Sequence, residues 1–337
     1  MKASASIQSG QTGQTGRTGQ TGAESTGSMA RKPRALRAGA AVLPFGPASP
    51  AATDRVAAGL QELQSLGLRA LDYPVREPRG FVAGSTEERR DDFLRGLTRD
   101  GADALIAIRG GYGSNYLLDG LAIAEPEQAK IILGYSDLTS LQIFVWQRYG
   151  WVTLYGPMIA AGLDNGAGNA KGYDKESLVA ALFARGEEWA IPLRGETLIA
   201  GEAEGRILGG CMTLVETTLG TPWELDTTGA ILVLEDRGMK PWQVDRALMH
   251  LLQAGKFSEV RGILLGDFPE TVATVPGSPT VREVCERILA PLGIPVVFGA
   301  PVGHTMRPML TVPLGVRGRL VSQGEGVLEI LEPAVSA

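Results

Sequence analysis

The sequence predicts an α/β protein with two domains: an open, mainly parallel sheet in the N-terminal half and a β-rich α+β domain in the C-terminal half. Three observations support this prediction. The chain has 337 residues, which corresponds to about two domains of ordinary size. In the first half, short apolar runs alternate with segments of helical periodicity, which is the pattern of βαβ units. After residue 160 the spacing changes, and short strand-like runs become more frequent.

The N-terminal α/β domain is expected over residues 32–160. Each apolar run there is short enough for a buried strand, and the longer segments carry apolar residues three or four positions apart, as on one face of a helix. Right-handed crossovers would place helices on both faces of the sheet. The expected strands are 38–43, 68–71, 104–108, 131–133 and 152–154, and the expected helices are 51–66, 87–100, the segment after Gly113, and 137–149.

Residues 161–195 are expected to link the domains, because their first part (162–172) holds four glycines and two asparagines and one helix follows it. The C-terminal domain is expected over residues 196–337. Its expected elements are a hairpin arm at 202–209, strands at 230–234 and 260–265, helices at 211–219, 241–254 and 280–290, and several short strands up to Glu332.

Residues 1–28 form a low-complexity tail built on a repeated Gln-Thr-Gly triplet. With almost no apolar side chains to bury, this segment cannot offset the entropy of ordering, so we expect either a disordered tail or a natural start at Met29 that excludes it. It also lacks the apolar stretch of a secretory signal. No segment of the chain reaches about 18 consecutive apolar residues, so we expect no membrane-spanning helix.

Composition excludes several kinds of chemistry. Two cysteines, Cys211 and Cys285, cannot form a disulfide framework or a cysteine-rich zinc site. Two histidines, His250 and His304, leave little for a multi-histidine metal site. We therefore expect a reducing compartment and chemistry without a metal or cofactor. The net charge of −5, from 32 basic and 37 acidic residues, argues against nucleic acid as a partner.

The glycine-rich turn RGGYGSN at 109–115 is the first candidate site. It lies between an apolar strand and a helix, and ligands of open parallel sheets bind beyond the carboxyl ends of the strands. At such a turn Ser114 could expose its hydroxyl as a nucleophile, close to backbone N–H groups. Two other interpretations remain open: Ser114 caps the helix, or the loop cradles a phosphate, although the GxGxxG pattern and the Walker lysine are both missing.

Candidates for an acid and a base lie in the C-terminal half. Glu235 and Asp236 follow the apolar run 231–234, so a buried strand would present them at its carboxyl end. Alternatively, they simply reach solvent, or Asp236 pairs with Arg237.

His304 lies in a loop, and histidine is the usual general base near neutral pH. By contrast, His250 lies within a helical stretch among apolar neighbours. The order Ser114, Glu235, His304 is that of the α/β-hydrolases, although the turn is not GxSxG and the acid and base fall in a separate domain.

Several longer motifs resemble those of the LD-carboxypeptidases, the serine peptidase family that includes muramoyltetrapeptide carboxypeptidase. RGGYGSNYLLDGL at 109–121 is similar to the segment we assign to the family's nucleophile. The other matching segments are GYSDLT at 134–139, GPM at 156–158, the stretch 209–238 that leads to Glu235, Asp245-Arg246, Gly303-His304, and LTVPLG at 310–315. They follow in the family's order from about Arg37 to Glu332, which is nearly the whole chain outside the tail.

The resemblance implies a triad in which Ser114 is the nucleophile, His304 the general base and Glu235 the acid that orients it. The oxyanion would be held by the backbone N–H of Asn115, with Gly84 as the second donor. The implied fold is a Rossmann-like N-terminal domain and a β-rich C-terminal module, with the site between them.

The same resemblance implies the reaction and its setting. Members of the family cleave the L,D-peptide bond that releases terminal D-Ala from murein tetrapeptides, through an acyl-enzyme, in cytoplasmic peptidoglycan recycling. We therefore expect a small peptide substrate and no binding to nucleic acid or membrane. A homodimer is also compatible with this expectation.

A carboxypeptidase must also bind the free terminal carboxylate of its substrate. Arg109 and Arg246 are candidates, because a guanidinium can bind a carboxylate through two parallel hydrogen bonds, although either could instead be structural. Many family members carry arginine two residues after the assigned nucleophile, where this chain has Tyr116.

Two other functions remain open. The microcin C immunity proteins of the same family hydrolyse peptidyl or aminoacyl adenylates, and they would need an aromatic side chain near the domain junction to stack on the nucleobase. Trp189 and Trp223 lie in the second half, where aromatic residues are more often part of the core. A non-catalytic two-domain ligand-binding protein would need no triad, and would more often carry an export signal.

Overall fold

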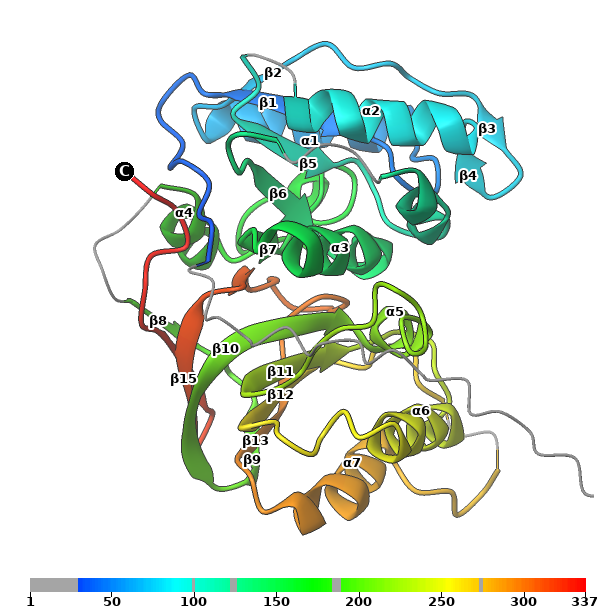
Figure 1. Cartoon of the computed structure of the whole chain (residues 1–337), viewed down its shortest axis with the longest axis vertical. Helices are drawn as coiled ribbons and strands as arrows, with labels where there is room; N and C mark the ends of the chain where they lie inside the picture. Colours follow the sequence, from blue (N-terminus) through cyan, green and yellow to red (C-terminus); the bar gives the residue numbers. More distant parts are fainter. Residues whose placement is uncertain (1–29, 99–100, 122–125, 184–188, 273–274) are drawn as a thin grey trace, which may run out of the picture.

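The computed structural model describes residues 30–98, 101–121, 126–183, 189–272 and 275–337, so the tail expected at 1–28 lies outside the described residues. The described chain forms two layered units, one above the other in Figure 1, each built on its own sheet. Helix α3 (Thr139–Tyr149) of the first unit and α5 (Met212–Thr217) of the second lie at the boundary between them. The α/β fold class predicted from the sequence is confirmed.

The first sheet is open and mainly parallel, as predicted. Its strand order is β14-β7-β6-β5-β1-β2, and every neighbouring pair is parallel except β14–β7 at one edge. The strands are β1 (Ala41–Phe45), β2 (Arg69–Ala70), β5 (Ala104–Ala107), β6 (Ile131–Gly134), β7 (Thr153–Tyr155) and β14 (Val312–Leu314). The antiparallel edge strand β14 comes from the C-terminal part of the chain, so the two halves of the sequence are interleaved in this sheet.

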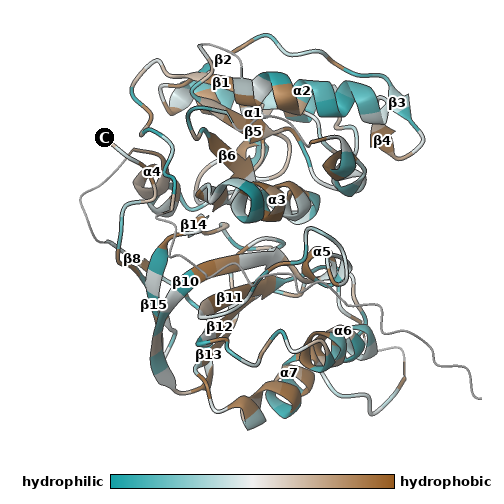
Figure 2. Ribbon diagram, in the orientation of Figure 1, coloured by the Kyte–Doolittle hydropathy of each residue, from teal (hydrophilic) through white to brown (hydrophobic). Residues whose placement is uncertain are grey.

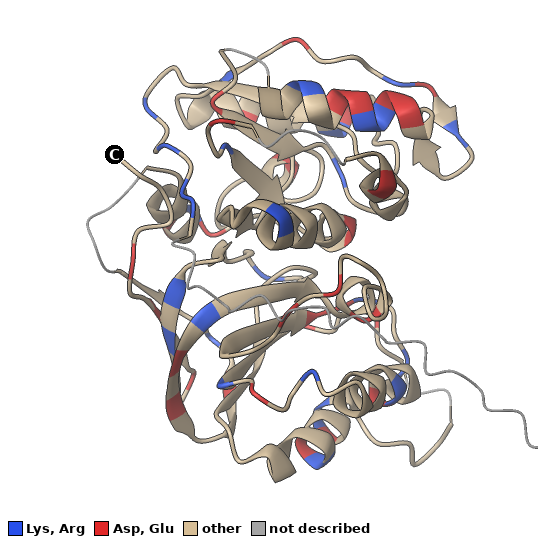
Figure 3. Cartoon of the chain, in the orientation of Figure 1, with Lys and Arg blue, Asp and Glu red and all other residues tan. Residues whose placement is uncertain are grey.

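Helices cover the first sheet at the positions that apolar periodicity predicts. The helices are α1 (Thr53–Ser65), α2 (Thr86–Thr98), α3 and α4 (Lys175–Phe183), together with the short turns η1 (Ser114–Gly120), η2 (Ser136–Leu138) and η3 (Leu163–Asn165) and the hairpin of β3 (Pro78–Arg79) and β4 (Val82–Ala83). Helix α2 is rich in acidic and basic residues (Figure 3), of which Arg89 and Asp92 are buried. The segment after Gly113 differs from the prediction, because it is a 3₁₀ helix rather than an α-helix.

The second sheet has eight strands in the order β8-β16-β15-β10-β11-β12-β13-β9. Its strands are β8 (Trp189–Pro192), β9 (Glu196–Ile199), β10 (Gly201–Cys211), β11 (Ala230–Glu235), β12 (Gly262–Gly266), β13 (Val296–Ala300), β15 (Arg317–Ser322) and β16 (Val327–Ile330). The four central strands, β10 to β13, are parallel, and the strands on either side are antiparallel. The C-terminal half is therefore β-rich at its edges and contains βαβ units at its centre.

Three helices connect the parallel strands of this sheet: α5, α6 (Pro241–Gln253) and α7 (Val281–Leu289), the last followed by η4 (Ala290–Leu292). The hairpin arm expected at 202–209 is wrong. Strand β10 pairs with β15 over its first half and runs parallel to β11 over its second, because at eleven residues it extends beyond β11. None of the helices in the described ranges is both long enough and apolar enough to span a membrane.

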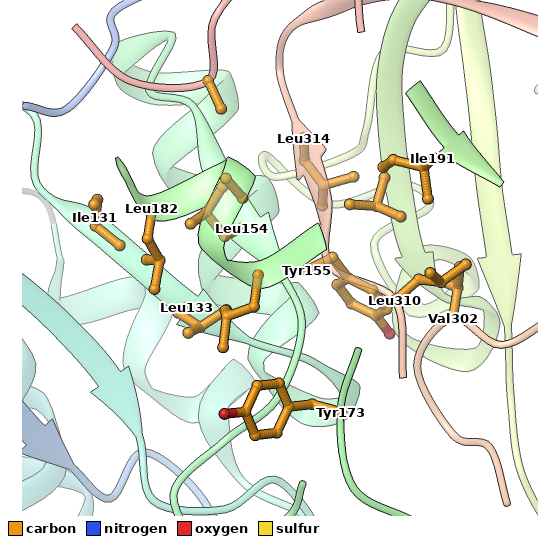
Figure 4. Packing of buried hydrophobic residues seen from close by; sticks show 14 of the residues in the cluster. Ile131, Leu133, Leu154, Tyr155, Tyr173, Leu182, Ile191, Val302, Leu310 and Leu314 are labelled. Carbon is orange, nitrogen blue, oxygen red and sulfur yellow. The ribbon is translucent and has the colours of Figure 1, made fainter. Parts of the chain in front are cut away.

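Hydrophobic residues are concentrated in the central strands of both sheets (Figure 2). One buried cluster includes residues of both sheets, such as Leu133 and Leu154 from the first unit and Val233 and Leu264 from the second. Figure 4 shows part of this cluster, in which Tyr155 lies with Leu310 and Leu314. The two units therefore share a core, which fixes how the loops at their facing edges meet.

Helix α1 approaches the turn after β7 so closely that only glycine fits at Gly59. A Cβ at this position would lie 1.9 Å from the backbone oxygen of Ile159. Two hydrogen bonds hold the turn against the end of β5. The N–H of Ile159 donates to the backbone oxygen of Ala107 at 3.0 Å, and the N–H of Ala160 donates to that of Ile108 at 2.8 Å. A helix glycine is therefore required for packing at this contact.

We predict that Gly59→Ala lowers the free energy of unfolding by about 2 kcal/mol or more, because the added methyl group overpacks the contact and outweighs the usual helix preference for alanine. Urea unfolding followed by circular dichroism measures the change. The control is Ala58→Gly on the exposed side of the same helix, which should cost about 1 kcal/mol from propensity alone. A stabilising effect of Gly59→Ala would contradict the close packing.

Candidate active site

The carboxyl ends of the central strands of both sheets open onto one cavity of about 660 Å³. Residues after β5, β6 and β7 line it from the first unit, and residues after β10, β11 and β12 and from the loop after β13 line it from the second. Ligands of open α/β sheets bind beyond the carboxyl ends of their strands, and here two sheets present these ends to the same space. The cavity is therefore the natural place to look for the site.

Glu235 and His304, the acid and base expected from the sequence, are brought together at this cavity. Glu235 is the last residue of β11 and is fully buried. Its Oε2 accepts hydrogen bonds from the backbone N–H of His304 at 2.8 Å and from the His304 ring at Nδ1, at 2.9 Å. Because a carboxylate accepts at Nδ1, that nitrogen carries the proton and Nε2 is left as the basic nitrogen.

A second serine, Ser136, lines the same cavity as His304. It lies two residues after the end of β6, begins the short turn η2 that leads into α3, and has a φ of 63°, in the left-handed region that residues other than glycine seldom adopt. Strained backbone of this kind is concentrated at functional sites, and a sharp strand–turn–helix elbow is the usual mount of a nucleophile. The ring of the preceding residue, Tyr135, packs edge-on against His304, with the ring centres 5.1 Å apart.

The loop after β5 closes on this elbow. A Cβ at Gly110 would lie 2.9 Å from the Cβ of Ser136 and 3.3 Å from the backbone nitrogen of Asp137, so only glycine allows the approach. The backbone of Gly110 therefore lies against the Ser136 side chain and the first turn of the elbow, and Gly111 lines the same cavity. This is the arrangement in which backbone N–H groups can stabilise a developing oxyanion.

Ser114, the nucleophile expected from the sequence, does not lie at the cavity. It is fully buried in η1. Its backbone N–H donates to the Asp137 carboxylate at 2.7 Å, and its hydroxyl donates to the Asp137 backbone carbonyl. The left-handed Gly113 turns the chain so that the Ser114 side chain faces the base of the elbow instead of the cavity. Among the described residues, the serine that shares the cavity with His304 is Ser136.

The sequence also contains a signal for Ser136. The segment GYSDLT at 134–139 follows an apolar strand and precedes a helix, so it meets the same criterion that selected Ser114. The glycines before Ser114 favoured the other turn, whose serine does not line the cavity. They serve the site differently, because they let the neighbouring loop approach Ser136.

Asp137 holds the two turns together. Burial raises the pKa of its carboxyl group, against hydrogen bonds from the backbone of Ser114 and Gly113 and the nearby charge of Arg89. Arg89 is itself buried and donates to the backbone oxygens of Pro47 and Gly113, at 2.6 and 2.7 Å. This buried polar network connects η1, the elbow and α2, so Ser114 belongs to the scaffold of the site.

The expected oxyanion donors lie elsewhere. Asn115 is exposed beside Ser114, away from the cavity lining. The N–H of Gly84 already donates to the backbone oxygen of Glu77 at 3.1 Å. Tyr116, at the position where many family members have arginine, is exposed, and its hydroxyl lies 3.2 Å from that of Tyr112.

The two arginine candidates separate clearly. Arg109 lines the cavity next to Gly110, and its Nη1 donates to the backbone oxygen of Pro50 at 2.8 Å. Arg246 lies on α6, where its guanidinium stacks over the ring of Trp242 at 5.0 Å and takes no part in the cavity.

Neither tryptophan considered for nucleobase stacking lines the cavity. Trp189 is in the edge strand β8, opposite Ile330 of β16, and packs against the shared core. Trp223 packs edge-on against Phe144, with the ring centres 5.0 Å apart.

The cavity has both positive and negative side chains. Arg55, Arg109, Lys171 and Arg237 contribute positive charge, and Asp236 and Glu270 contribute negative charge. Nη2 of Arg237 donates to both carboxylate oxygens of Glu270 at 2.7 Å, and this ion pair lowers the pKa of Glu270. Burial raises the pKa of Asp236, whose carboxylate accepts from Thr213 and from the backbone of Arg237. The cavity is thus suited to a ligand that carries charges of its own.

A serine on a strained elbow, a histidine and a buried carboxylate, set where two α/β layers meet, are the parts of a serine hydrolase. The comparisons with known proteins agree. The model of the LD-carboxypeptidase N-terminal domain matches residues 43–156, and that of the LD-carboxypeptidase C-terminal domain matches residues 204–320. The chain therefore belongs to the LD-carboxypeptidase family, and the resemblance seen in the sequence is confirmed.

Individual relatives support the same conclusion. A probable murein peptide carboxypeptidase of Bacillus subtilis is 34% identical over 279 residues, which cover 81% of this chain and 86% of the relative. The structure of a muramoyltetrapeptide carboxypeptidase from Oxalobacter formigenes matches with a TM-score of 0.77 at 26% identity, over 87% of this chain and 99% of that one. The structure of MccF in complex with glutamyl sulfamoyl guanosine shares the fold, with a TM-score of 0.80 at 23% identity, over 90% of this chain and 99% of that one.

We predict that Ser114→Ala lowers the free energy of unfolding by about 1–2 kcal/mol, because it removes a buried hydroxyl and leaves the Asp137 carbonyl without that donor. Chemical denaturation measures the loss. Ser258→Ala is the control, since its exposed hydroxyl also donates to a nearby carbonyl and its removal should change stability by less than about 0.5 kcal/mol. Equal effects of the two substitutions would show that the buried bond does not hold η1 in place.

Proposed function

We propose that this protein is a serine LD-carboxypeptidase that hydrolyses the L,D-peptide bond to the terminal D-Ala of murein tetrapeptides, with Ser136 as the nucleophile in place of Ser114. One observation carries the proposal: the strained elbow serine lines the same cavity as His304, whose ring is held by the buried Glu235. The family membership and the names of the relatives support the substrate class.

The proposed mechanism follows from these positions. Nε2 of His304 takes the Ser136 hydroxyl proton as Oγ attacks the carbonyl carbon of the L,D-bond. The backbone N–H of Asp137, the residue after the nucleophile, and the N–H groups of the Gly110–Gly111 loop bind the oxyanion. The imidazolium, stabilised by Glu235, then protonates the amine of the departing D-Ala. Water, deprotonated by the same nitrogen, attacks the acyl-enzyme and regenerates Ser136.

Arg109 is our proposed ligand for the terminal carboxylate of the substrate. It precedes Gly110, where a Cβ would lie 2.9 Å from the Cβ of Ser136, and it lines the same cavity as Ser136. The carboxylate of a C-terminal D-Ala lies one residue beyond the scissile bond, which suits a cation at this place. A guanidinium can form two parallel hydrogen bonds with a carboxylate, which orients the substrate as well as binding it.

We further propose that the reaction takes place in the cytoplasm, on peptides released during cell-wall recycling. Both cysteines, Cys211 and Cys285, are buried free thiols, as is usual in a reducing compartment.

We predict that Ser136→Ala lowers kcat on a murein tetrapeptide by about 10⁴-fold or more, whereas Ser114→Ala stays within about tenfold of the wild type. The reason is that only Ser136 can pass a proton to His304 and receive the acyl group. Mass spectrometry of the D-Ala and tripeptide products measures both rates.

Two further measurements complete this test. A peptidyl adenylate assayed beside the tetrapeptide measures the alternative substrate class, and we expect slower turnover of it. Thermal unfolding shows that each variant is folded at the assay temperature. Near-normal activity of Ser136→Ala, or loss of activity only in Ser114→Ala, would return the nucleophile to position 114.

We predict that Arg109→Met raises KM for a tetrapeptide with a free C-terminus by about 10- to 100-fold, the usual effect of removing a charge-assisted hydrogen bond. A tetrapeptide with an amidated C-terminus should lose much less, because it never had the ion pair. Arg246→Met is the matched control, as that arginine stacks on Trp242 outside the cavity, and it should leave both KM values unchanged. An equal loss for the two peptides would contradict the carboxylate role of Arg109.

A further inference from the structure

We propose that Tyr155 is a positioning residue that joins the nucleophile elbow of the first unit to the catalytic acid of the second, and thereby sets the basicity of His304. The inference rests on the proposed function, because it assumes the roles of Ser136, His304 and Glu235. It concerns a residue that lies next to the GPM motif and that neither the sequence motifs nor the proposed mechanism uses.

The hydroxyl of Tyr155 makes two hydrogen bonds, one to each half of the site. It accepts from the backbone N–H of Ser136 at 3.2 Å and donates to Oε1 of Glu235 at 2.5 Å. The second oxygen of the same carboxylate, Oε2, accepts from His304. The chain of contacts therefore runs without a break from the backbone of the elbow, through one phenol, to the acid and on to the base.

These contacts cross the boundary between the two units. Tyr155 ends β7 of the first sheet, and Glu235 ends β11 of the second. Because each oxygen of the carboxylate has its own partner, the Glu235 side chain is fixed against rotation. If one unit shifted relative to the other, Glu235 would lose its bond to Tyr155, or its side chain would follow Tyr155 and lose the bond to His304. The phenol therefore fixes the position of the base relative to the nucleophile.

Packing makes Tyr155 a rigid link. Its side chain is fully buried in the shared core (Figure 4). The ring of Tyr135 lies edge-on at 6.3 Å between ring centres. On the other side, the backbone of β10 comes so close that a Cβ at Gly210 would lie 3.1 Å from Cε2 of Tyr155. Burial raises the pKa of Tyr155, as does the charge of Glu235, so the phenol keeps its proton and remains a donor.

The donated bond also has an electrostatic consequence. A hydrogen bond to Oε1 draws negative charge away from Oε2 and weakens the attraction of the carboxylate for the imidazolium proton. Removing the phenol oxygen should therefore make His304 hold its proton more strongly. The other titratable groups facing the pair, which stay unchanged in the test, are Tyr135, Cys211, Asp236, Arg237 and Glu270.

The test is an NMR titration of the histidine ring signals in Tyr155→Phe. The chain has only two histidines, and His250→Gln in both backgrounds leaves His304 as the single signal. We expect the midpoint of its titration to move to higher pH by about 0.5–1 pH unit, since one hydrogen bond to a charged group is lost. The acid limb of the kcat/KM profile should move in the same direction, and kcat should fall by about tenfold or more with little change in KM.

Tyr149→Phe is the matched control. The Tyr149 hydroxyl is buried at the end of α3, where its ring packs against Phe144 and Trp151 and Arg148 is the neighbouring charge. Its removal takes away the same atom without touching Glu235 or His304. It should leave both the titration and the activity as in the wild type. An unmoved His304 midpoint in folded Tyr155→Phe, or an equal shift in the two variants, would overturn the proposal.

A second substitution keeps the test open if Tyr155→Phe does not fold. Replacing Tyr155 site-specifically with 3-fluorotyrosine keeps the ring and makes the phenol a stronger donor, so the midpoint should move to lower pH; no shift would refute the idea. The titration needs no substrate. A shifted midpoint together with an active Ser136→Ala would contradict only the proposed function, and an unshifted midpoint together with an inactive Ser136→Ala would contradict only the role of Tyr155.

Discussion

The buried carboxylate of Glu235 is the constraint on which the rest of the site depends. A charge without access to water is costly unless hydrogen bonds satisfy it, and at Glu235 these come from both units: Tyr155 from the first, and the ring and backbone of His304 from the second. The arrangement of the two sheets is thereby tied to the chemistry. The shared apolar core brings the layers together, and the polar contacts of Glu235 decide the register in which they meet.

A second constraint is the left-handed backbone at Ser136. Such a conformation is unfavourable for a residue with a side chain, and it persists where surrounding contacts over-determine it. Those contacts come from Asp137, which holds η1 through Ser114, and from the Tyr155 hydroxyl, which accepts the Ser136 N–H. The glycine-rich loop contributes by its lack of side chains, since any Cβ at Gly110 would push the elbow away. Ser114 thus supports the turn that carries Ser136.

The same geometry explains why one cavity can serve a small charged peptide. The carboxyl ends of parallel strands from two sheets face each other, so each contributes loops that can vary without disturbing the core. Positive side chains enter from both units, and the Arg237–Glu270 pair gives the second unit a group of each sign at the cavity.

The sequence by itself determined the fold class, the positions of most strands and helices, and the family, and it predicted as acid and base the pair Glu235 and His304 that the structure brings into contact. It could do so because apolar periodicity reports burial locally and because only two histidines limited the choice of base. It did not determine which serine faces that base. Ser114 and Ser136 both follow an apolar strand at a turn. Local patterns do not reveal which of these serines has a left-handed backbone, or which hydroxyl is already hydrogen-bonded to a neighbouring residue. Nor did it indicate that β14 returns to the first sheet or that Tyr155 reaches Glu235. These are contacts between residues far apart in the chain, and only the packing of the two sheets against each other decides them.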